Sequence, residues 1–261
     1  MRNHKLKRLY VDSPLVSGGV IILSDSQHHY LRNVMRLSSN ANMLVFNGQD
    51  GEWKVELTHC DKKTSQALVL EQTRTQPYQP DIWLCYAPIK NSHSEYMIEK
   101  STELGVSRFQ PILTQHTIVN RIKPEKIRAH SIDAAQQCGR LSLPEIGPLL
   151  PSLDKALQDW PESRRILLCD ETGQGTPIAQ ALSSYTAQHQ DSSEPWAIFI
   201  GPEGGFSHSE LALLYKLPYV TSVSMGPRVM RADTAAIAAL TCWQSHLGDW
   251  YDLPEFRQDT R

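Results

Sequence analysis

Residues 1–72 carry apolar side chains in short runs that are separated by turn-forming residues. Each run has the length of a β-strand, and several alternate between apolar and polar positions, as expected for a half-buried strand. Asn47, Gly48, Asp50 and Gly51 form a turn signal between two of the runs. The strands are predicted at residues 8–11, 19–23, 42–46, 52–57 and 65–71. The pattern predicts a small β-barrel or sandwich.

One segment of this region has a helical pattern instead. Leu31, Val34 and Met35 recur at the spacing of one helix face, and Arg32 and Arg36 lie about one turn apart. We expect one short helix within residues 27–37, which interrupts the strands.

Residues 73–81 are polar, contain two prolines and fit no periodic element, which indicates a linker. After them strand and helix patterns alternate, as is typical of an α/β domain with a largely parallel sheet. The predicted strands are residues 82–87, 108–114, 165–170, 196–200 and 220–225. The predicted helices are residues 94–104, 124–138, one that opens at Thr176 with Pro177 in its first turn, one after Ser207, and 234–247.

Capping signals mark two of these helices. Ser92 with Glu95, and Ser207 with Glu210, each have the spacing of a capping box, and Gly105 is a stop signal for the first helix. The predicted organisation is therefore a β-domain over residues 1–72, a linker over 73–81, an α/β domain over 82–250 and a tail over 251–261.

Composition then limits the class of protein. The 261-residue chain has 40% hydrophobic and 21% charged residues, as expected for a globular protein of two domains. The formal net charge of -2 argues against a protein that coats nucleic acid with its whole surface, so any such contact is expected to be local.

Two further classes are disfavoured by pattern. Five cysteines without a C-x-x-C pair predict neither a disulfide framework nor a zinc site, and no other ligand spacing accompanies His28 and His29. No apolar run is long enough to cross a membrane, and the N-terminus lacks the apolar stretch of a signal peptide. We therefore expect a cytoplasmic protein with no metal and no membrane partner.

The first segment with chemical potential is IFIGPEGGFSHSE, in which an apolar strand leads into a glycine-rich turn before a capped helix. Glycines let the backbone turn tightly and let a ligand approach closely, and the carboxyl ends of parallel strands face the ligand crevice. A tight turn without a ligand would need the same residues. The phosphate-binding patterns of P-loop nucleotidases and Rossmann dehydrogenases are both absent.

The second such segment is SVSMGPRVMRADTAAIAAL, in which a strand and a glycine turn are followed by Arg228, Arg231 and Asp233 at the start of an apolar helix. Asp233 is favoured there by the helix dipole, and the arginines could merely pair with it. Two glycine turns at strand ends of one domain nevertheless indicate a shared pocket.

Four segments together resemble the RsmE family of 16S ribosomal RNA methyltransferases, which form N3-methyluridine. They are IGPEGGFSHSE, SMGPRVMRADTA, KNSHSEYMIEKSTELGV and AAQQCGRLSLPEI, and they occur in the family's order. The resemblance covers nearly the whole chain. It implies a PUA-like RNA-binding β-barrel at the N-terminus, a SPOUT-type α/β domain with a parallel sheet and a C-terminal trefoil knot, and S-adenosyl-L-methionine (SAM) as the methyl donor.

Carried over by position, the resemblance also implies a set of site residues. The donor pocket would be lined by Leu168, Gly201, Pro202, Glu203, Gly204, Gly205, Met225, Gly226, Val229, Met230 and Arg231. Enzymes of this type are homodimers with the knots in the interface. The apolar last helix, with Trp243, is a candidate contributor to that interface, although burial within its own subunit would explain the same residues.

The expected chemistry needs help mainly at the acceptor. The N3 of uridine normally carries a proton, so the site must help to remove it and stabilise negative charge on the flanking carbonyl oxygens. Arg231 is expected nearest the reacting base, with Arg228 in support, and Glu203 or Asp233 as the proton acceptor or as an arginine-orienting group. The family usually has Glu in place of Asp233, so a helix cap or arginine partner remains an alternative for Asp233.

The predicted substrate-binding residues are mostly basic. Lys100, Glu103, Gln137 and Arg140 fall at family positions, although a surface ion pair would explain the first two equally well. A local basic patch for RNA phosphates is expected from Arg2, Lys5, Lys7, Arg8, Arg32 and Arg36. The expected partner is 16S ribosomal RNA or the assembled small subunit.

Two other functions fit parts of the sequence. One is a SPOUT methyltransferase that acts on transfer RNA or another ribosomal position, and the other is a non-catalytic RNA-binding assembly protein that retains the fold. The N-terminal domain argues against the first alternative, and the intact glycine turns argue against the second.

Overall fold

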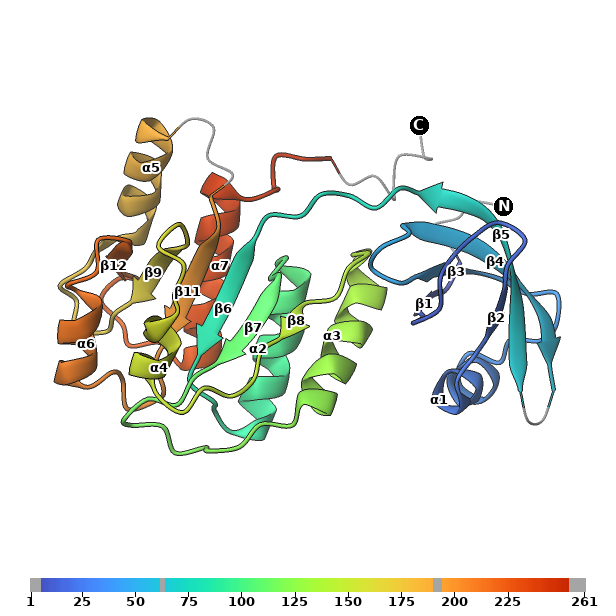
Figure 1. The fold of residues 1–261 in the computed structure, drawn as a ribbon, viewed down its shortest axis with the longest axis horizontal. Coiled ribbons are helices and arrows are strands. Elements are labelled where there is room, and N and C mark those ends of the chain that lie inside the picture. The colour runs from blue at the N-terminus through green and yellow to red at the C-terminus, as the bar shows by residue number, and fades with distance from the viewer. Residues whose placement is uncertain (1–5, 62–63, 190–193, 254–261) are drawn as a thin grey trace. The chain divides into compact units, whose positions relative to one another are not determined.

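The computed structural model describes residues 6–61, 64–189 and 194–253, and the chain forms two compact units (Figure 1). The first unit comprises Met1–Tyr78, Ala135–Leu143 and Leu253–Arg261. The second unit comprises Gln79–Ala134 and Pro144–Asp252.

The first unit contains a five-stranded sheet in the order β1-β3-β4-β5-β2. Its strands are β1 (Arg8–Tyr10), β2 (Val20–Ile22), β3 (Asn42–Phe46), β4 (Glu52–Cys60) and β5 (Ser65–Arg74). All five predicted strands are present, because alternating side chains such as Val55, Leu57 and Val69 fill one core while their neighbours face outward. β1 pairs parallel with β3, and the remaining pairs are antiparallel.

The predicted helix of this unit is two short pieces, α1 (Asp25–His29) and the π-helical η2 (Tyr30–Val34). Leu31 is fully buried as expected, but 62% of Val34 is exposed, so the predicted apolar face was wrong at that position. The reason is the wider π turn, in which the Met35 N–H bonds the Tyr30 carbonyl five residues back and changes the angular spacing of side chains.

The second unit is built on a seven-stranded, wholly parallel sheet in the order β10-β12-β9-β11-β6-β7-β8. The strands are β6 (Ile82–Tyr86), β7 (Arg108–Pro111), β8 (Glu145–Ile146), β9 (Arg165–Cys169), β10 (Thr176–Pro177), β11 (Trp196–Ile200) and β12 (Val220–Ser224). The central strand β11 is buried at all five positions, as expected where helices cover both faces. The predicted parallel α/β sheet is confirmed.

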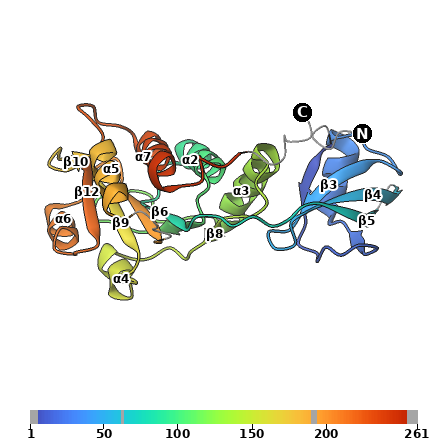
Figure 2. The same cartoon turned by 90° about the horizontal axis from the view of Figure 1, so that it is seen from above.

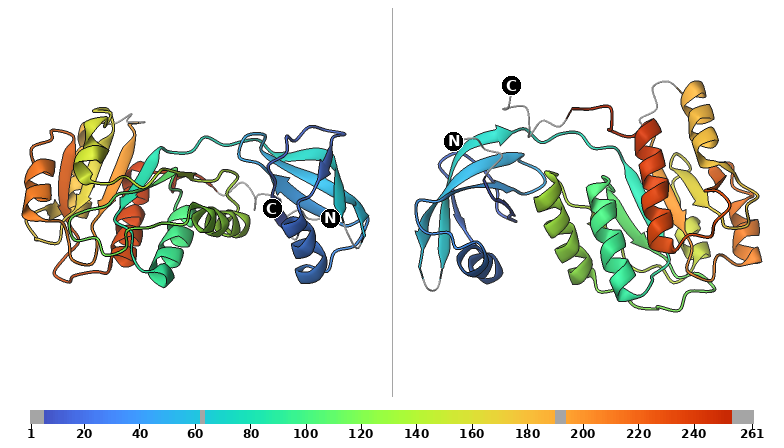
Figure 3. Two further views of the ribbon diagram at one scale, coloured as in Figure 1. Left: turned by 60° about the horizontal axis from the view of Figure 1, so that its bottom comes forward. Right: turned by 180° about the vertical axis from the view of Figure 1, so that it is seen from behind.

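Helices cover both faces of this sheet (Figure 2). One face packs against α2 (Asn91–Glu103), α3 (Pro124–Cys138), α5 (Ile178–Gln188) and α7 (Ala232–Leu247), and the other against α4 (Leu153–Gln158) and α6 (His208–Leu214). The three layers can also be followed from behind (Figure 3). In a sheet of this kind all strands end at one edge, so the loops after the strands meet there.

Local structure departs from the predictions at three places. α2 begins after Lys90 without a side-chain cap, so the predicted capping box of Ser92 and Glu95 was wrong. Thr176 and Pro177 pair with β12 as β10, and α5 starts one residue later than Pro177. α4 and β8 were not predicted. The capping box of Ser207 and Glu210 on α6 is confirmed.

Residues Ala135–Leu143 group with the first unit, whereas the predicted boundaries place them inside the 82–250 domain. Arg8 donates to the carbonyl of Ala135 at 2.7 Å across 127 positions of sequence, and the Tyr10 N–H donates to the side chain of Gln136 at 3.0 Å. Phe46 and Leu141 pack with Ala135 in a small apolar cluster. Contacts over such a separation leave no local sequence pattern.

Candidate active site

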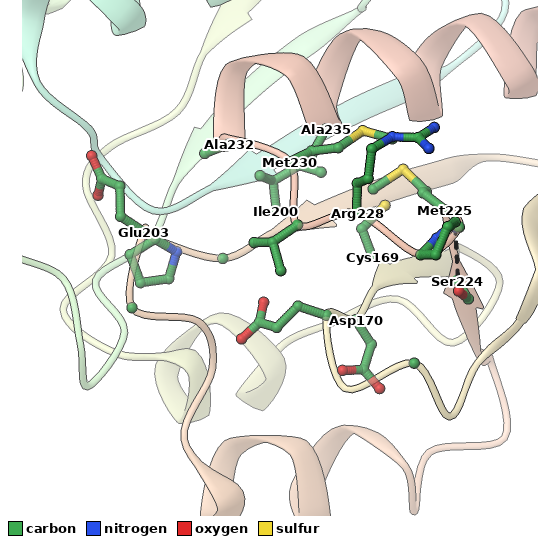
Figure 4. Close-up of a pocket in the computed structure, with 18 residues that line it drawn as sticks. Cys169, Asp170, Ile200, Glu203, Ser224, Met225, Arg228, Met230, Ala232 and Ala235 are labelled. Atoms are coloured by element: carbon green, nitrogen blue, oxygen red, sulfur yellow. Dashed lines mark hydrogen bonds between the residues drawn. The ribbon is translucent and has the colours of Figure 1, made fainter.

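The ends of β9, β11 and β12 and the start of α7 enclose a cavity of about 410 Å³, here called the strand-end cavity (Figure 4). Both glycine turns singled out in the sequence contribute to it, so the predicted shared pocket is present. It is lined by Cys169, Asp170, Glu171, Gly173, Ile200, Gly201, Pro202, Glu203, Gly204, Ser224, Met225, Gly226, Pro227, Arg228, Val229, Met230, Ala232 and Ala235. Its volume lies in the usual range for small-molecule sites.

The turn after β12 depends on glycine at one position. Gly226 has a φ of +98°, a conformation that side chains rarely adopt, and an added Cβ there would meet nothing within 4 Å. The backbone conformation rather than crowding therefore requires glycine. It opens the loop that carries Met225, Arg228 and Met230 along the cavity.

A carboxylate at the end of β9 ties three elements together. The side chain of Asp170 accepts hydrogen bonds from the Tyr215 hydroxyl, from the Thr172 hydroxyl at 2.7 Å and from the Ser222 hydroxyl at 3.5 Å. Burial alone would raise the pKa of Asp170, but these hydrogen bonds outweigh it and hold the pKa below its ordinary value of 3.8. Asp170 is therefore ionised at neutral pH.

The cavity carries more negative than positive side chains. Asp170, Glu171 and Glu203 line it together with a single guanidinium, that of Arg228. Burial and the neighbouring Asp170 carboxylate raise the pKa of Glu171 above its ordinary value of 4.5. The cavity is thus better suited to a cationic ligand than to a phosphate.

Cys169 lines the cavity but is not an activated nucleophile. Its side chain is 6% exposed, and burial raises the pKa of its thiol to about 12. The attacking species in cysteine chemistry is the thiolate. Covalent catalysis by this thiol at neutral pH is therefore disfavoured.

His93, on the first turn of α2, is held between an acid and an arginine of the segment that opens α7. Its Nδ1 lies 2.8 Å from Asp233 Oδ2, and its Nε2 lies 3.4 Å from Arg231 Nη1. Because a guanidinium only donates, Nε2 is assigned as the acceptor, and Nδ1 carries the proton that is donated to Asp233. In this assignment the Nε2 of His93 is turned to Arg231.

Contacts of this kind also determine the pKa of Asp233. Burial would raise its pKa, but hydrogen bonds from His93 and from the Thr234 N–H hold the pKa below 3.8. Its carboxylate faces His93 in place of the predicted arginine partner. Arg231 and Asp233 flank Ala232, which lines the strand-end cavity. His93 was not among the predicted site residues, because no spacing signal links it to Asp233 across 140 positions.

Three predicted donor-pocket residues do not line the cavity. Leu168 is fully buried in the core on the other face of the sheet, and Cys169 lines the cavity instead, since neighbouring strand residues face opposite sides. Gly205 lies next to the lining residues with a φ of +69°. The Arg231 side chain is turned to His93. The other predicted lining residues are all present.

The predicted catalytic groups Arg228 and Glu203 both line the cavity and are exposed. Figure 4 shows them on opposite sides of it, with the Glu203 carboxylate directed away from Arg228. The structure thus does not bring these two side chains together.

Several predicted substrate residues have structural partners within the first unit. Arg8 is 12% exposed, pairs with Glu52 at 2.8 Å and donates to three carbonyls of residues 135–140, so these packing contacts already occupy the guanidinium that was predicted to contact phosphate. Arg140 is also buried and donates to Ser142. Arg32 donates to the Asp61 carbonyl at 2.6 Å, whereas Arg36 is exposed.

The other predicted substrate-binding residues lie on α2, in the first unit or outside the described residues. On α2, Lys100 pairs with Glu103 at 2.7 Å, as the ion-pair alternative expected, and this bond raises the pKa of Lys100. Lys7 and Gln137 lie in the first unit, and Arg2 and Lys5 fall outside the described residues.

Two absences hold for the part of the chain that the structure describes. Residues 6–61, 64–189 and 194–253 contain no group of three or more His, Cys, Asp or Glu side chains placed to hold a metal ion. In the same ranges no helix has the length and apolarity needed to cross a bilayer.

The family described as RNA methyltransferase domain matches residues 76–244, and the family described as RNA methyltransferase PUA domain matches residues 23–70. This chain belongs to the RNA methyltransferase family. It is 29% identical to ribosomal RNA small subunit methyltransferase E of Rickettsia conorii, over 90% of this chain and 94% of that protein. It is 30% identical to the protein of the same name from Synechocystis, over 89% and 75%.

Two solved structures have the same fold. A ribosomal RNA small subunit methyltransferase E from Neisseria gonorrhoeae, bound to SAM, has a TM-score of 0.81 at 25% identity over 94% of this chain and 99% of that one. A methyltransferase of Legionella pneumophila in complex with SAM has a TM-score of 0.80 at 27% identity, over 95% and 100%. The predicted SPOUT fold with an N-terminal PUA domain is confirmed, while the trefoil knot stays a prediction.

Proposed function

We propose that this protein methylates N3 of a specific uridine in 16S ribosomal RNA, with SAM as the methyl donor. The observation that carries the proposal is the strand-end cavity, in which both glycine turns of the RsmE-like sequence meet beside Arg228, with Arg231 adjacent. The names of the relatives and their bound SAM support the same function.

The residues of the strand-end cavity fit SAM. When bound, SAM supplies an activated methyl group on a sulfonium cation. The carboxylates of Asp170 and Glu171 give the cavity the negative potential that suits a cation. Ile200, Met225 and Met230 offer apolar surface for the adenine ring, and the glycine turns leave room for close backbone contact.

The acceptor needs positive charge where its carbonyl oxygens develop negative charge. We assign this role to Arg231 with Arg228 in support, because both belong to the loop that leaves the cavity and enters α7. The raised thiol pKa of Cys169, at about 12, disfavours methylation at carbon through a cysteine adduct, which favours a nitrogen acceptor.

His93 is the best-placed acceptor for the N3 proton. Its Nδ1 is oriented by Asp233, and its Nε2 can take the proton once Arg231 turns from Nε2 to a carbonyl oxygen of the uracil, which frees the single lone pair of that nitrogen. Glu203 and Asp233 were the predicted candidates, but the Glu203 carboxylate is directed away from Arg228 (Figure 4). Asp233 then acts as the group that orients the base.

The proposal also includes the RNA partner, the location and the oligomeric state of the protein. We infer that the first unit binds RNA, that the substrate is 16S ribosomal RNA or the assembled small subunit, and that the protein is a cytoplasmic homodimer. Trp243 is 2% exposed and packs within its own core, so the apolar contact between subunits falls to residues such as Val229, which is 88% exposed.

The test is nucleoside mass spectrometry of ribosomal RNA from cells that lack the protein. Complementation with wild type is expected to restore one N3-methyluridine, and Arg231→Ala is expected to restore none. Calorimetry with SAM on both proteins is the control, since Arg231→Ala should keep donor binding. An unchanged 16S profile would redirect the assignment to transfer RNA, and absence of SAM binding by the wild type would favour a non-catalytic assembly protein.

A further inference from the structure

A second cavity, of about 230 Å³, lies between α2 and α3 in the second unit and is here called the α2–α3 cavity. Its floor is apolar, with Ile89, Ile98 and Ile127 almost fully buried. The volume is several times the roughly 30 Å³ that one water occupies in the liquid, and it is below the range of about 300 to 1,000 Å³ typical of drug-sized ligands. The space therefore suits one planar ring better than a whole cofactor.

Tyr86 lines the α2–α3 cavity and has an unmet hydrogen-bonding group. The residue is 2% exposed, and its hydroxyl is buried with no partner among the described residues. A buried hydroxyl without a hydrogen bond costs free energy, so such groups usually have a function or a missing partner. A ligand with an acceptor at the edge of an apolar ring would supply that partner.

The rim of the α2–α3 cavity is basic. Arg121, Lys123 and Lys126 line it and are exposed, against one lining carboxylate, that of Glu95. Arg121 and Lys123 have no ion pair within the described ranges, and Lys126 is 3.9 Å from Glu95. This balance is opposite to that of the strand-end cavity, so a phosphate is attracted here and disfavoured there.

The two cavities lie at one edge of the sheet. Tyr86 ends β6 and Ile200 ends β11, and these two residues are paired in neighbouring parallel strands. Ile200 lines the strand-end cavity and Tyr86 lines the α2–α3 cavity. His93 bonds Asp233 and Arg231, while the adjacent Ser94 lines the α2–α3 cavity. A strand of RNA held at one cavity would therefore pass the other.

We propose that the α2–α3 cavity binds one nucleotide of the RNA substrate, with the base on the apolar floor against Tyr86 and its phosphates on Arg121, Lys123 and Lys126. This rests on the proposed function only in that the substrate is RNA. A nucleobase combines an apolar face with acceptors at its edge, and single-stranded RNA is recognised through such splayed bases. The site holds the strand while the reacting uridine lies at the donor.

Tyr86→Phe is the decisive variant, because it removes only the hydroxyl. The free protein loses no hydrogen bond in this change, so its melting temperature is expected to stay the same or rise. The Kd for a fluorescein-labelled single-stranded RNA decamer containing uridines, measured by anisotropy, is expected to rise about fivefold to tenfold, as for a lost bond to a base. If the hydroxyl only supports the fold, Tyr86→Phe would lower the melting temperature and leave the Kd for the decamer unchanged.

Lys123→Glu tests the rim, with Lys216→Glu as the matched control. Lys216 is an exposed lysine of the same unit that lines neither cavity. We expect Lys123→Glu to weaken decamer binding at least tenfold and Lys216→Glu to change it less than twofold. Equal decamer affinity of Tyr86→Phe, Lys123→Glu and wild type, or no affinity of wild type, would overturn the proposal.

Two further measurements distinguish recognition of an RNA strand from binding of a single nucleotide, and failure of this site from failure of the proposed function. Uridine 5′-monophosphate as competitor should displace the decamer only at much higher concentration, because it has a single phosphate, and displacement at similar concentration would contradict recognition of a strand. SAM calorimetry and methyl transfer to unmodified 16S RNA are measured on the same proteins. Weakened RNA binding without any methyl transfer by wild type would leave the nucleotide site standing while the proposed function fails.

Discussion

The proposed chemistry at the acceptor involves a few side chains that lie outside the glycine turns. His93 is one of them, because it joins α2 to the segment that opens α7 through Asp233 and Arg231. Asp233 has a carboxylate that reaches His93 at 2.8 Å, and this fixes the tautomer of the imidazole. In the proposed chemistry Arg231 and His93 therefore act together, with positive charge and the proton acceptor side by side.

Replacement of His93 by Gln keeps an amide that can bond Asp233 but removes the titratable nitrogen. We expect kcat for methyl transfer to fall about 100-fold, in the usual range for loss of a general base. SAM affinity by calorimetry is the control and should stay unchanged. A wild-type kcat in His93→Gln would show that another group takes the proton.

Among the elements, the loop between β12 and α7 contributes six of the 18 residues that line the strand-end cavity. Its shape depends on Gly226, whose φ of +98° is accessible to glycine and strained for other residues. The loops after β9 and β11 meet it because all the strands of the second unit are parallel and end at one edge. The position of the site thus follows from strand direction, and its detailed shape follows from one backbone angle.

Gly226→Ala tests this dependence, and Gly18→Ala is a matched control in the first unit. Gly18 has a φ of +78°, and an added Cβ at either glycine would meet nothing within 4 Å, so the strain is the same in kind. Each substitution is expected to lower stability by about 1 kcal/mol or more, seen as a lower melting temperature. Only Gly226→Ala should weaken SAM binding in calorimetry. Equal SAM affinity in both variants would exclude a role for this loop in donor binding.

For the molecule as a whole, stability has to be considered unit by unit. The chain forms two compact units, so unfolding need not be a single transition, and a change in one unit shifts only its own part of the melting curve. Asp170 belongs to the second unit and links the end of β9 to Tyr215 after α6 and Ser222 in β12. Its ionisation therefore contributes to the stability of that unit.

The sign of the pH effect follows from the lowered pKa of Asp170. A carboxyl with a lower pKa in the folded state stabilises the fold above its unfolded pKa, near 3.8, and that contribution is lost as pH falls through the folded value. The melting temperature of the second unit is therefore expected to fall steeply below about pH 4 in the wild type. Asp170→Asn should melt lower at pH 7 and show a flatter decline. Calorimetric scans from pH 7 to 3 measure both, and parallel curves would contradict the assignment.

Much of this organisation is present in the amino-acid sequence. Alternating apolar positions predicted all the strands of the first unit, and the βα alternation predicted the parallel sheet, because side-chain periodicity is a local property. The glycine turns at Gly201 and Gly226 also identified most of the strand-end cavity. A glycine turn at the end of a buried strand is a local signal of this kind.

What only the tertiary structure decided are the contacts between distant segments. His93 meets Asp233 across 140 positions, and Arg8 anchors residues 135–140 through packing contacts that no sequence pattern indicated. Leu168 faces the opposite side of the sheet from the cavity, because strand order and helix placement determine which face borders the site. The sequence determined local periodicity and the chemistry of each loop. Which loops and side chains meet was decided by packing between elements, which is non-local and leaves no spacing in the chain.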